Sequence, residues 1–170
     1  MRWTWPASRG RRLLLFAMVG AGVIAASLPI IGLRWQIGID PQVYRCLPEV
    51  HAVLIDLKRE PKARGELVSF EARGLEPAFP DGRILVKILA GIPGDRVDID
   101  ANGVRINGTP AASGLALAQA LGHSPETFAR SFTIPDGFFF ALGTGPRSLD
   151  SRYYGPVPTS RIRGKAWALW

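Results

Sequence analysis

The sequence predicts a mostly β domain with a small helical insertion, carried on one N-terminal transmembrane helix. An uncharged, apolar run covers residues 13–33, which is long enough to cross a hydrocarbon layer of about 30 Å at about 1.5 Å per helical residue. Short apolar stretches separated by turn residues follow it, as in a sheet protein. The 19 glycines and 14 prolines argue against a helical bundle.

The basic flank of the apolar run sets its orientation. Arg9, Arg11 and Arg12 precede it, and the positive-inside rule keeps such an arm in the cytoplasm. A cleaved secretory signal is the alternative, but the apolar run exceeds the length typical of such signals. Either interpretation places the folded domain outside the cytoplasm. We expect a cytoplasmic arm, a single-pass anchor in the cytoplasmic membrane and a periplasmic domain, at residues 1–12, 13–33 and 34–170.

The charge distribution excludes a nucleic-acid partner. Five arginines and no acidic residue lie in the first 34 residues, and they account for all but two of the net charge of +7. The rest of the chain has no zinc-ligand spacing and no basic recognition helix. We expect no metal and no cofactor.

The domain after the anchor divides into short elements. The chain from 36 to 44 is expected to be an extended approach strand. Residues 102–103 (Asn-Gly) predict a hairpin turn, and the stretch 113–130 predicts helix, broken around 122–125. Further strands are expected at 51–57, 66–71, 83–90, 96–107 (as a hairpin) and 138–142, and the chain closes with 161–170.

Lys87 lies inside one of these predicted strands, in the stretch ILVKILA. Strand side chains alternate between faces, so Leu85 and Leu89 share its face. Burial among apolar side chains disfavours the charged form of an amine, and a neutral amine can take a proton from a nucleophile. The alternative is a lysine at a strand edge whose amine reaches water.

Cys46 is the only cysteine, so it cannot form a disulfide within the chain. It is an inert buried residue, an intermolecular partner or a reactive thiol. Pro48 keeps the preceding residue extended, and Arg45 is a nearby positive charge. The site suits an exposed nucleophile without specifying one.

Four segments, in order, resemble the type I signal peptidase family, in particular the TraF-type peptidases of conjugative transfer. Cys46-Leu47-Pro48 matches the nucleophile segment, and residues 64–70 match a following strand. Residues 86–95 (VKILAGIPGD) match the lysine segment. Residues 143–158, containing SLDSRYYGPVP, match the last segment. The resemblance implies a signal-peptidase-like β domain.

The resemblance also implies roles for individual residues. Cys46 falls on the nucleophile, which is serine in the family, and Lys87 falls on the general base. Ser148 falls on the hydroxyl that orients the lysine. Asp150 and Arg152 match a structural pair that supports the active-site loop, together with Gly143, the glycine that opens it.

Two departures from the family pattern bear on mechanism. The nucleophile is a thiol, so Cys46 and Lys87 could exist as a coupled thiolate–ammonium pair. Tyr44 stands where the family often has a hydroxyl that stabilises the oxyanion, and its phenol could donate instead. A dyad of Cys46 with His51 or His123 is a less favoured alternative.

The resemblance implies an endopeptidase that removes leader segments from exported precursors, such as pilin or other conjugative-transfer proteins. It would cleave after a small residue through an acyl-enzyme. Two alternatives stay open. One is an inactive family member that binds pilin or secretion components, and the other is a thiol protein that pairs with a partner's cysteine.

Overall fold

The computed structural model describes residues 16–22, 32, 34–40 and 45–169. The chain divides into two units, residues 1–35 and 36–170. Residues 16–22 are helical and exposed, and no helix within the described ranges has the length and apolar character needed to cross a membrane. The predicted arm at 1–12 and most of the predicted anchor at 13–33 lie outside the described residues.

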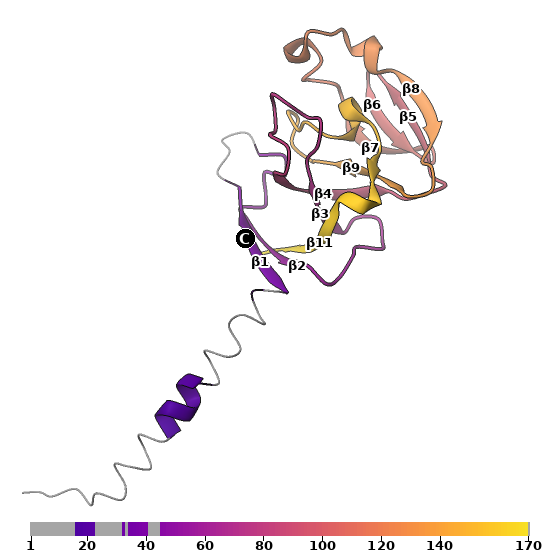
Figure 1. The fold of residues 1–170 in the computed structure, drawn as a ribbon. Helices are drawn as coiled ribbons and strands as arrows, with labels where there is room; N and C mark the ends of the chain where they lie inside the picture. Colours follow the sequence, from indigo (N-terminus) through magenta and orange to yellow (C-terminus); the bar gives the residue numbers. More distant parts are fainter. Residues whose placement is uncertain (1–15, 23–31, 33, 41–44, 170) are drawn as a thin grey trace, which may run out of the picture. The chain divides into compact units, whose positions relative to one another are not determined.

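The larger of two sheets has seven strands in the order β1-β2-β11-β3-β4-β9-β10 (Figure 1). From β2 to β10, neighbouring strands pair antiparallel. Their bounds are β1 Trp35–Ile39, β2 Ala52–Asp56, β3 Leu67–Glu71, β4 Ile84–Gly91, β9 Phe138–Leu142, β10 Val157–Pro158 and β11 Ile162–Ala168. The strands predicted at 51–57, 66–71, 83–90 and 138–142 are therefore confirmed, with small shifts at their ends.

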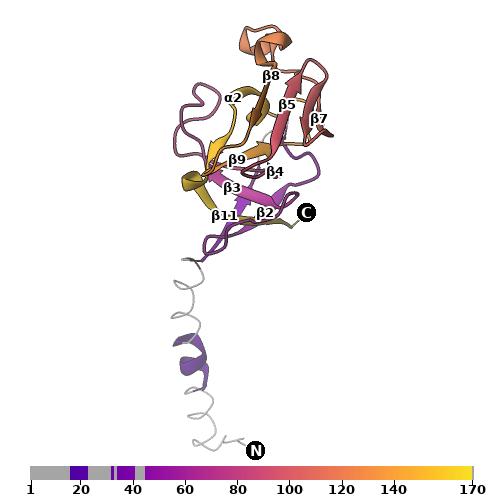
Figure 2. The same ribbon diagram turned by 90° about the vertical axis from the view of Figure 1, so that its right-hand side faces the viewer.

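The second sheet has four strands in the order β7-β6-β5-β8 and lies beside β4 and β9 in both views (Figures 1 and 2). Its strands are β5 Arg96–Asp100, β6 Gly103–Ile106, β7 Thr109–Ser113 and β8 Arg130–Thr133. The predicted hairpin is confirmed, since β5 and β6 pair from Val97↔Ile106 to Asp100↔Gly103. β7 and β8 carry polar, weakly alternating sequences and were not predicted.

The prediction of helix at 113–130 is wrong. The segment forms only two 3-10 turns, η1 Gln119–Leu121 and η2 Pro125–Phe128. Gly122 adopts a left-handed conformation that ends η1, and Pro125 cannot continue a helix from the preceding turn. The other short helical elements are α2 Ser151–Tyr154 and η3 Thr159–Arg161.

The core contains one apolar cluster shared by the two sheets. Val97 and Ile106 of the small sheet pack in the same buried cluster as Phe140 and Leu142 of β9. A second cluster joins Phe70, Leu85 and Phe139 within the larger sheet. Because neighbouring residues of β9 alternate between the two clusters, the clusters cover opposite faces of this strand, which is therefore tightly packed on both sides.

Asp95 organises the turn between β4 and β5. Its carboxylate accepts hydrogen bonds from the Arg64 side chain (Nε at 2.8 Å, with a second contact from Nη2), the Ile92 backbone N–H at 2.9 Å and Asn107 Nδ2 at 2.8 Å. The hydrogen bond from Arg64 is the main reason that the pKa of Asp95 falls from 3.8 to about 2. Asp95 thereby connects Arg64, next to the larger sheet, with Asn107, next to the smaller one.

Asp95→Asn should lower the free energy of unfolding of the full-length chain by about 1–3 kcal/mol at pH 7, because it weakens several buried hydrogen bonds to a charged group. The folded-state pKa lies below the unfolded one, so this contribution is present above about pH 4 and lost as the pH falls towards 2. Urea unfolding of both proteins from pH 7 to pH 2 measures the difference. Asp136→Asn, at an exposed position, is the control, and a difference from wild type that stays constant with pH would contradict the prediction.

Candidate active site

Lys87 points into the protein from the middle of β4. The strand shows strict alternation of burial, with Leu85, Lys87 and Leu89 on the buried side, as predicted. Lys87 is only 1% exposed, and its Nζ donates a hydrogen bond of 2.9 Å to Ser148 Oγ. No carboxylate among the described residues forms an ion pair with this amine. A hydroxyl therefore stands where a buried cation would ordinarily have an acid.

The loop between β9 and α2 holds Ser148 in place. Ser148 is fully buried, and its N–H donates to the Gly145 carbonyl at 3.1 Å. Asp150 caps α2 by accepting from the Arg152 N–H at 3.2 Å, and its other carboxylate oxygen accepts from the Gly143 N–H at 3.0 Å. One carboxylate thus joins both ends of the loop 143–150.

Arg152 completes this support. Its Nε and Nη2 donate to the two Asp150 oxygens, each at 2.9 Å, and its remaining donors reach the carbonyls of Ser148, Ser113 and Gly114. Burial alone would lower the pKa of the guanidinium, but the hydrogen bonds and charge of Asp150 raise it above its ordinary value. The contact is therefore bidentate and almost fully buried.

Cys46 lies on the loop before β2, and two glycines bring the Ser148 loop against it. The Gly145 N–H donates to the Cys46 carbonyl at 3.0 Å. A Cβ on Gly143 would lie 2.5 Å from that same carbonyl oxygen and closer still to Ser148 Oγ, and a Cβ on Gly145 would lie 2.5 Å from the Arg45 carbonyl. Only glycine allows the two loops to approach this closely.

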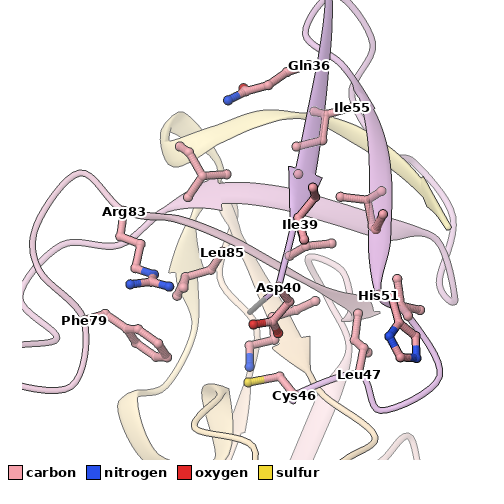
Figure 3. A pocket seen from close by; sticks show the side chains of 17 residues that line it. Gln36, Ile39, Asp40, Cys46, Leu47, His51, Ile55, Phe79, Arg83 and Leu85 are labelled. Carbon is pink, nitrogen blue, oxygen red and sulfur yellow. The ribbon is translucent and has the colours of Figure 1, made fainter. Parts of the chain in front are cut away.

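Cys46 and Lys87 line one pocket. In Figure 3, Cys46 lies below Asp40, with Phe79 and Arg83 on one side and Leu47 and His51 on the other. The pocket wall is mainly apolar and includes Leu47, Val53, Ile55, Phe79 and Leu85. A thiol and a buried amine thus face a shared apolar space of the kind that receives a peptide side chain.

One edge of β4 is open beside this pocket. β3 pairs with Ile84 to Ile88, whereas β9 pairs only with Ile88, Leu89 and Gly91. Arg83 and Leu89 bond to the β3 side, so by alternation the N–H and C=O groups of Ile84 and Val86 face the other side. No strand within the described ranges covers that side from Ile84 to Lys87.

The structure therefore gathers most of the residues singled out in the sequence. Lys87, Ser148, Asp150, Arg152 and Gly143 are linked as described, and Cys46 joins them through the loop contact. Tyr44 lies outside the described residues. His51 lines the pocket and its Nε2 is 3.4 Å from Arg45 Nη1, while His123 stacks edge-on against Phe128 in the other sheet's cluster.

Three contributors escaped the sequence analysis. Gly145 was visible as the second glycine of Gly-Thr-Gly, but only the close approach of the two loops explains it. Ser151 Oγ accepts from the Ala141 N–H at 3.0 Å, and Arg83 lines the pocket. Ser151 lies within the segment that resembles the family but was assigned no role there, and Arg83 carries no local sequence signal, because its place in the pocket depends on segments distant in the chain.

The sequence profile of the signal peptidase family, peptidase S26, matches residues 39–170. The chain belongs to this family. The match includes Cys46, Lys87 and the whole loop that carries Ser148 and Asp150, so the segments recognised in the sequence are family segments.

The chain is also similar to individual known proteins. A conjugal transfer protein TraF of Agrobacterium fabrum is 37% identical over 48% of this chain and 46% of its own length. A probable conjugal transfer protein TraF of Sinorhizobium fredii is 30% identical over 73% of this chain and 60% of its own, so the matches span about half of these relatives. A crystal structure of a signal peptidase I from Enterococcus faecalis is 28% identical, with a TM-score of 0.39 over 63% of this chain and 97% of its own.

Asp150→Asn should reduce the free energy of unfolding by about 3–5 kcal/mol, because it leaves the buried Arg152 charge uncompensated. Asp98→Asn is a matched control, since Asp98 also pairs with an arginine two residues away but on the surface. The control should cost at most about 1 kcal/mol. Urea unfolding of the full-length variants measures both. Equal losses of unfolding free energy in the two variants would contradict the prediction that the buried ion pair matters more than the exposed one.

Gly143→Ala should cost at least about 1–3 kcal/mol of unfolding free energy, because its Cβ would collide with the Cys46 carbonyl and Ser148. Thr144→Ala, at the exposed next position, should leave stability within about 0.5 kcal/mol of wild type. Thermal unfolding of the three proteins side by side tests this. A Gly143→Ala protein as stable as wild type would mean that the loops are not held this closely.

Proposed function

We propose that this protein is an endopeptidase that cuts leader segments from exported precursors, with Cys46 as nucleophile, Lys87 as general base and Ser148 as the residue that positions Lys87. The observation that carries the proposal is the 2.9 Å hydrogen bond from Lys87 Nζ to Ser148 Oγ, at a buried lysine that lines the same pocket as Cys46. Membership of the signal peptidase family supports the same reaction class.

Lys87 carries one proton in each half of the reaction, first from the Cys46 thiol to the leaving amine and then from water to the Cys46 thiolate. Lys87 takes the thiol proton, Cys46 Sγ forms a bond to the scissile carbonyl carbon, and the C=O electron pair moves to oxygen. When the C–N bond breaks, Lys87 returns the proton to the leaving amine and a thioester remains. Water then attacks the thioester through the same base, and Cys46 leaves as the thiolate and recovers its proton.

Ser148 keeps the lone pair of Lys87 pointed at the thiol. A neutral amine donates one N–H to Ser148 Oγ, which fixes the rotation about the last side-chain bond. Ser148 is itself fully buried, so Lys87 is oriented before the substrate binds and no reorganisation energy is spent during the reaction.

The oxyanion needs donors on the side of the scissile carbonyl away from the thiol. No acceptor in the described part of the chain takes the Cys46 N–H, which leaves this group for the oxyanion. The Tyr44 phenol, two residues earlier in the sequence, is the proposed second donor.

The open edge of β4 is the proposed binding site for the leader. A substrate strand added along Ile84–Lys87 would bond to the free backbone groups of Ile84 and Val86. β9 blocks the edge beyond Lys87, so a leader whose last carbonyl reaches Cys46 must run parallel to β4. The leader stays bound in the thioester while the mature amine departs.

The proposed location and precursor are supported by the sequence and by the names of the relatives. Residues 13–33 are the proposed anchor in the cytoplasmic membrane, with the peptidase domain in the periplasm. The names of the two TraF relatives favour pilin or another conjugative-transfer precursor as the substrate.

Cleavage should depend on all three residues of the proposed site. We expect Cys46→Ala to abolish cleavage of a co-expressed pilin precursor and Lys87→Met to slow it by about 10²–10⁴-fold. Ser148→Ala should slow it by about tenfold, the value of one hydrogen bond to an amine. Intact mass of the precursor, from wild type and each variant, is the measurement, and Lys58→Met, at an exposed turn, is the matched lysine control.

The outcomes separate the alternatives. Processing by Cys46→Ala at the wild-type rate would show that Cys46 is not the nucleophile. An intact precursor that co-purifies with the protein would favour a non-cleaving binding protein. A mixed disulfide on non-reducing gels that disappears in Cys46→Ala would favour a thiol-exchange partner. Cys46→Ser tests whether this site still supports the hydroxyl nucleophile used by the wider family.

A further inference from the structure

Arg83 is a charged side chain on the wall of the active-site pocket. It lies immediately before β4, and alternation along an extended chain puts its side chain on the same face as Leu85 and Lys87. Its backbone is fixed, since its N–H donates to the Pro80 carbonyl at 3.2 Å and its carbonyl accepts from the Ala72 N–H at 2.8 Å. Figure 3 shows its guanidinium beside Phe79 and Leu85.

The guanidinium has no protein partner in the described part of the chain. Five other arginines there pair with carboxylates: Arg64, Arg73, Arg96, Arg152 and Arg163. Arg83 forms no ion pair and no side-chain hydrogen bond with any described residue, although it lines a largely apolar pocket. Arg83 is exposed, so its charge is available to a ligand that enters the pocket, and the apolar wall on one side reduces the screening of that charge by water.

We propose that Arg83 is a specificity-determining residue that binds an aspartate or glutamate side chain in the leader of the precursor. The inference rests on the proposed function, because it assumes that the leader lies along β4 and ends at Cys46. A guanidinium can grip a carboxylate through two parallel hydrogen bonds, which an amide or hydroxyl side chain cannot match.

The spacing along β4 locates the recognised residue. Arg83 lies four residues before Lys87, which is about 13 Å along a strand. A parallel leader strand has the same rise, and the arginine side chain can extend several ångströms in either direction. The acidic residue therefore lies three to five residues before the scissile bond. Side chains of a strand alternate between its two faces, so only some of these positions face the pocket.

Reactive peptides test this without knowledge of the natural precursor. The probes are five-residue acyloxymethyl ketones ending in alanine, with Glu, Gln or Lys placed in turn three, four or five residues from the ketone. Cys46 Sγ forms a thioether to the ketone's methylene carbon as the carboxylate leaves, and Lys87 takes the thiol proton. Because Cys46 is the only cysteine, intact mass of the full-length chain reports labelling of one site.

We expect wild type to be labelled by a Glu probe about fivefold faster than by its Gln counterpart. This preference should appear either at the fourth position from the ketone alone, or at the third or fifth position or both, because alternate residues of a strand face the same side. The Glu-to-Gln ratio should fall to about one in Arg83→Gln, and Arg83→Glu should prefer Lys. High salt should reduce the wild-type ratio. Arg105→Gln is the matched control, since Arg105 is an exposed arginine of β6 in the other sheet and should leave the ratio unchanged.

The result distinguishes the two levels of the proposal. Labelling that requires Lys87 but shows no Glu preference, or a preference that persists in Arg83→Gln, overturns the role of Arg83 and leaves the peptidase intact. If no probe labels wild type faster than Lys87→Met, the proposed site itself fails, and the role of Arg83 fails with it.

Discussion

The buried ion pair between Asp150 and Arg152 is the interaction on which the geometry of the site depends. Two charges removed from water are stable only when each finds its full set of partners. Here the carboxylate also accepts from the Gly143 N–H, and the guanidinium also reaches the Ser148, Ser113 and Gly114 carbonyls. The pair therefore links the site loop, α2 and the end of β7, and the position of Ser148 follows from it.

Lys87 is a second buried basic side chain with a different environment. Arg152 meets a carboxylate, whereas the hydrogen-bond partner of Lys87 among the described residues is the Ser148 hydroxyl. An ammonium in this position would lose its hydration without the compensating charge that Arg152 has. The two buried basic side chains, 65 residues apart in the chain, therefore differ in their partners, since Arg152 is held by a carboxylate and Lys87 by a hydroxyl.

The position of the loop that carries Cys46 is set by its contact with the Ser148 loop. Cys46 lies on a short loop whose carbonyl is held by the Gly145 N–H, and the absence of side chains at Gly143 and Gly145 permits that contact. A thiol is longer and more acidic than a hydroxyl, so its exchange for serine alters both proton transfer and the distance to a bound carbonyl. The edge of β4 that no strand within the described ranges covers is available to the proposed substrate whether a thiol or a hydroxyl attacks.

The sequence by itself determined most strands of the larger sheet, the buried face of Lys87 and the family, because alternation and short motifs are local properties. It failed at 113–130, where Gly122 and Pro125 limit the chain to single turns, and at β7 and β8. β8 pairs with β5, about 30 residues earlier in the chain, whereas β7 pairs with its chain neighbour β6 but lacks an apolar alternation of its own. Tertiary structure alone decided that Gly145 must be small, that Arg152 reaches β7 and that Arg83 enters the pocket of Cys46. These features arise where segments 30 to 100 residues apart in the chain meet, and no local pattern records such contacts.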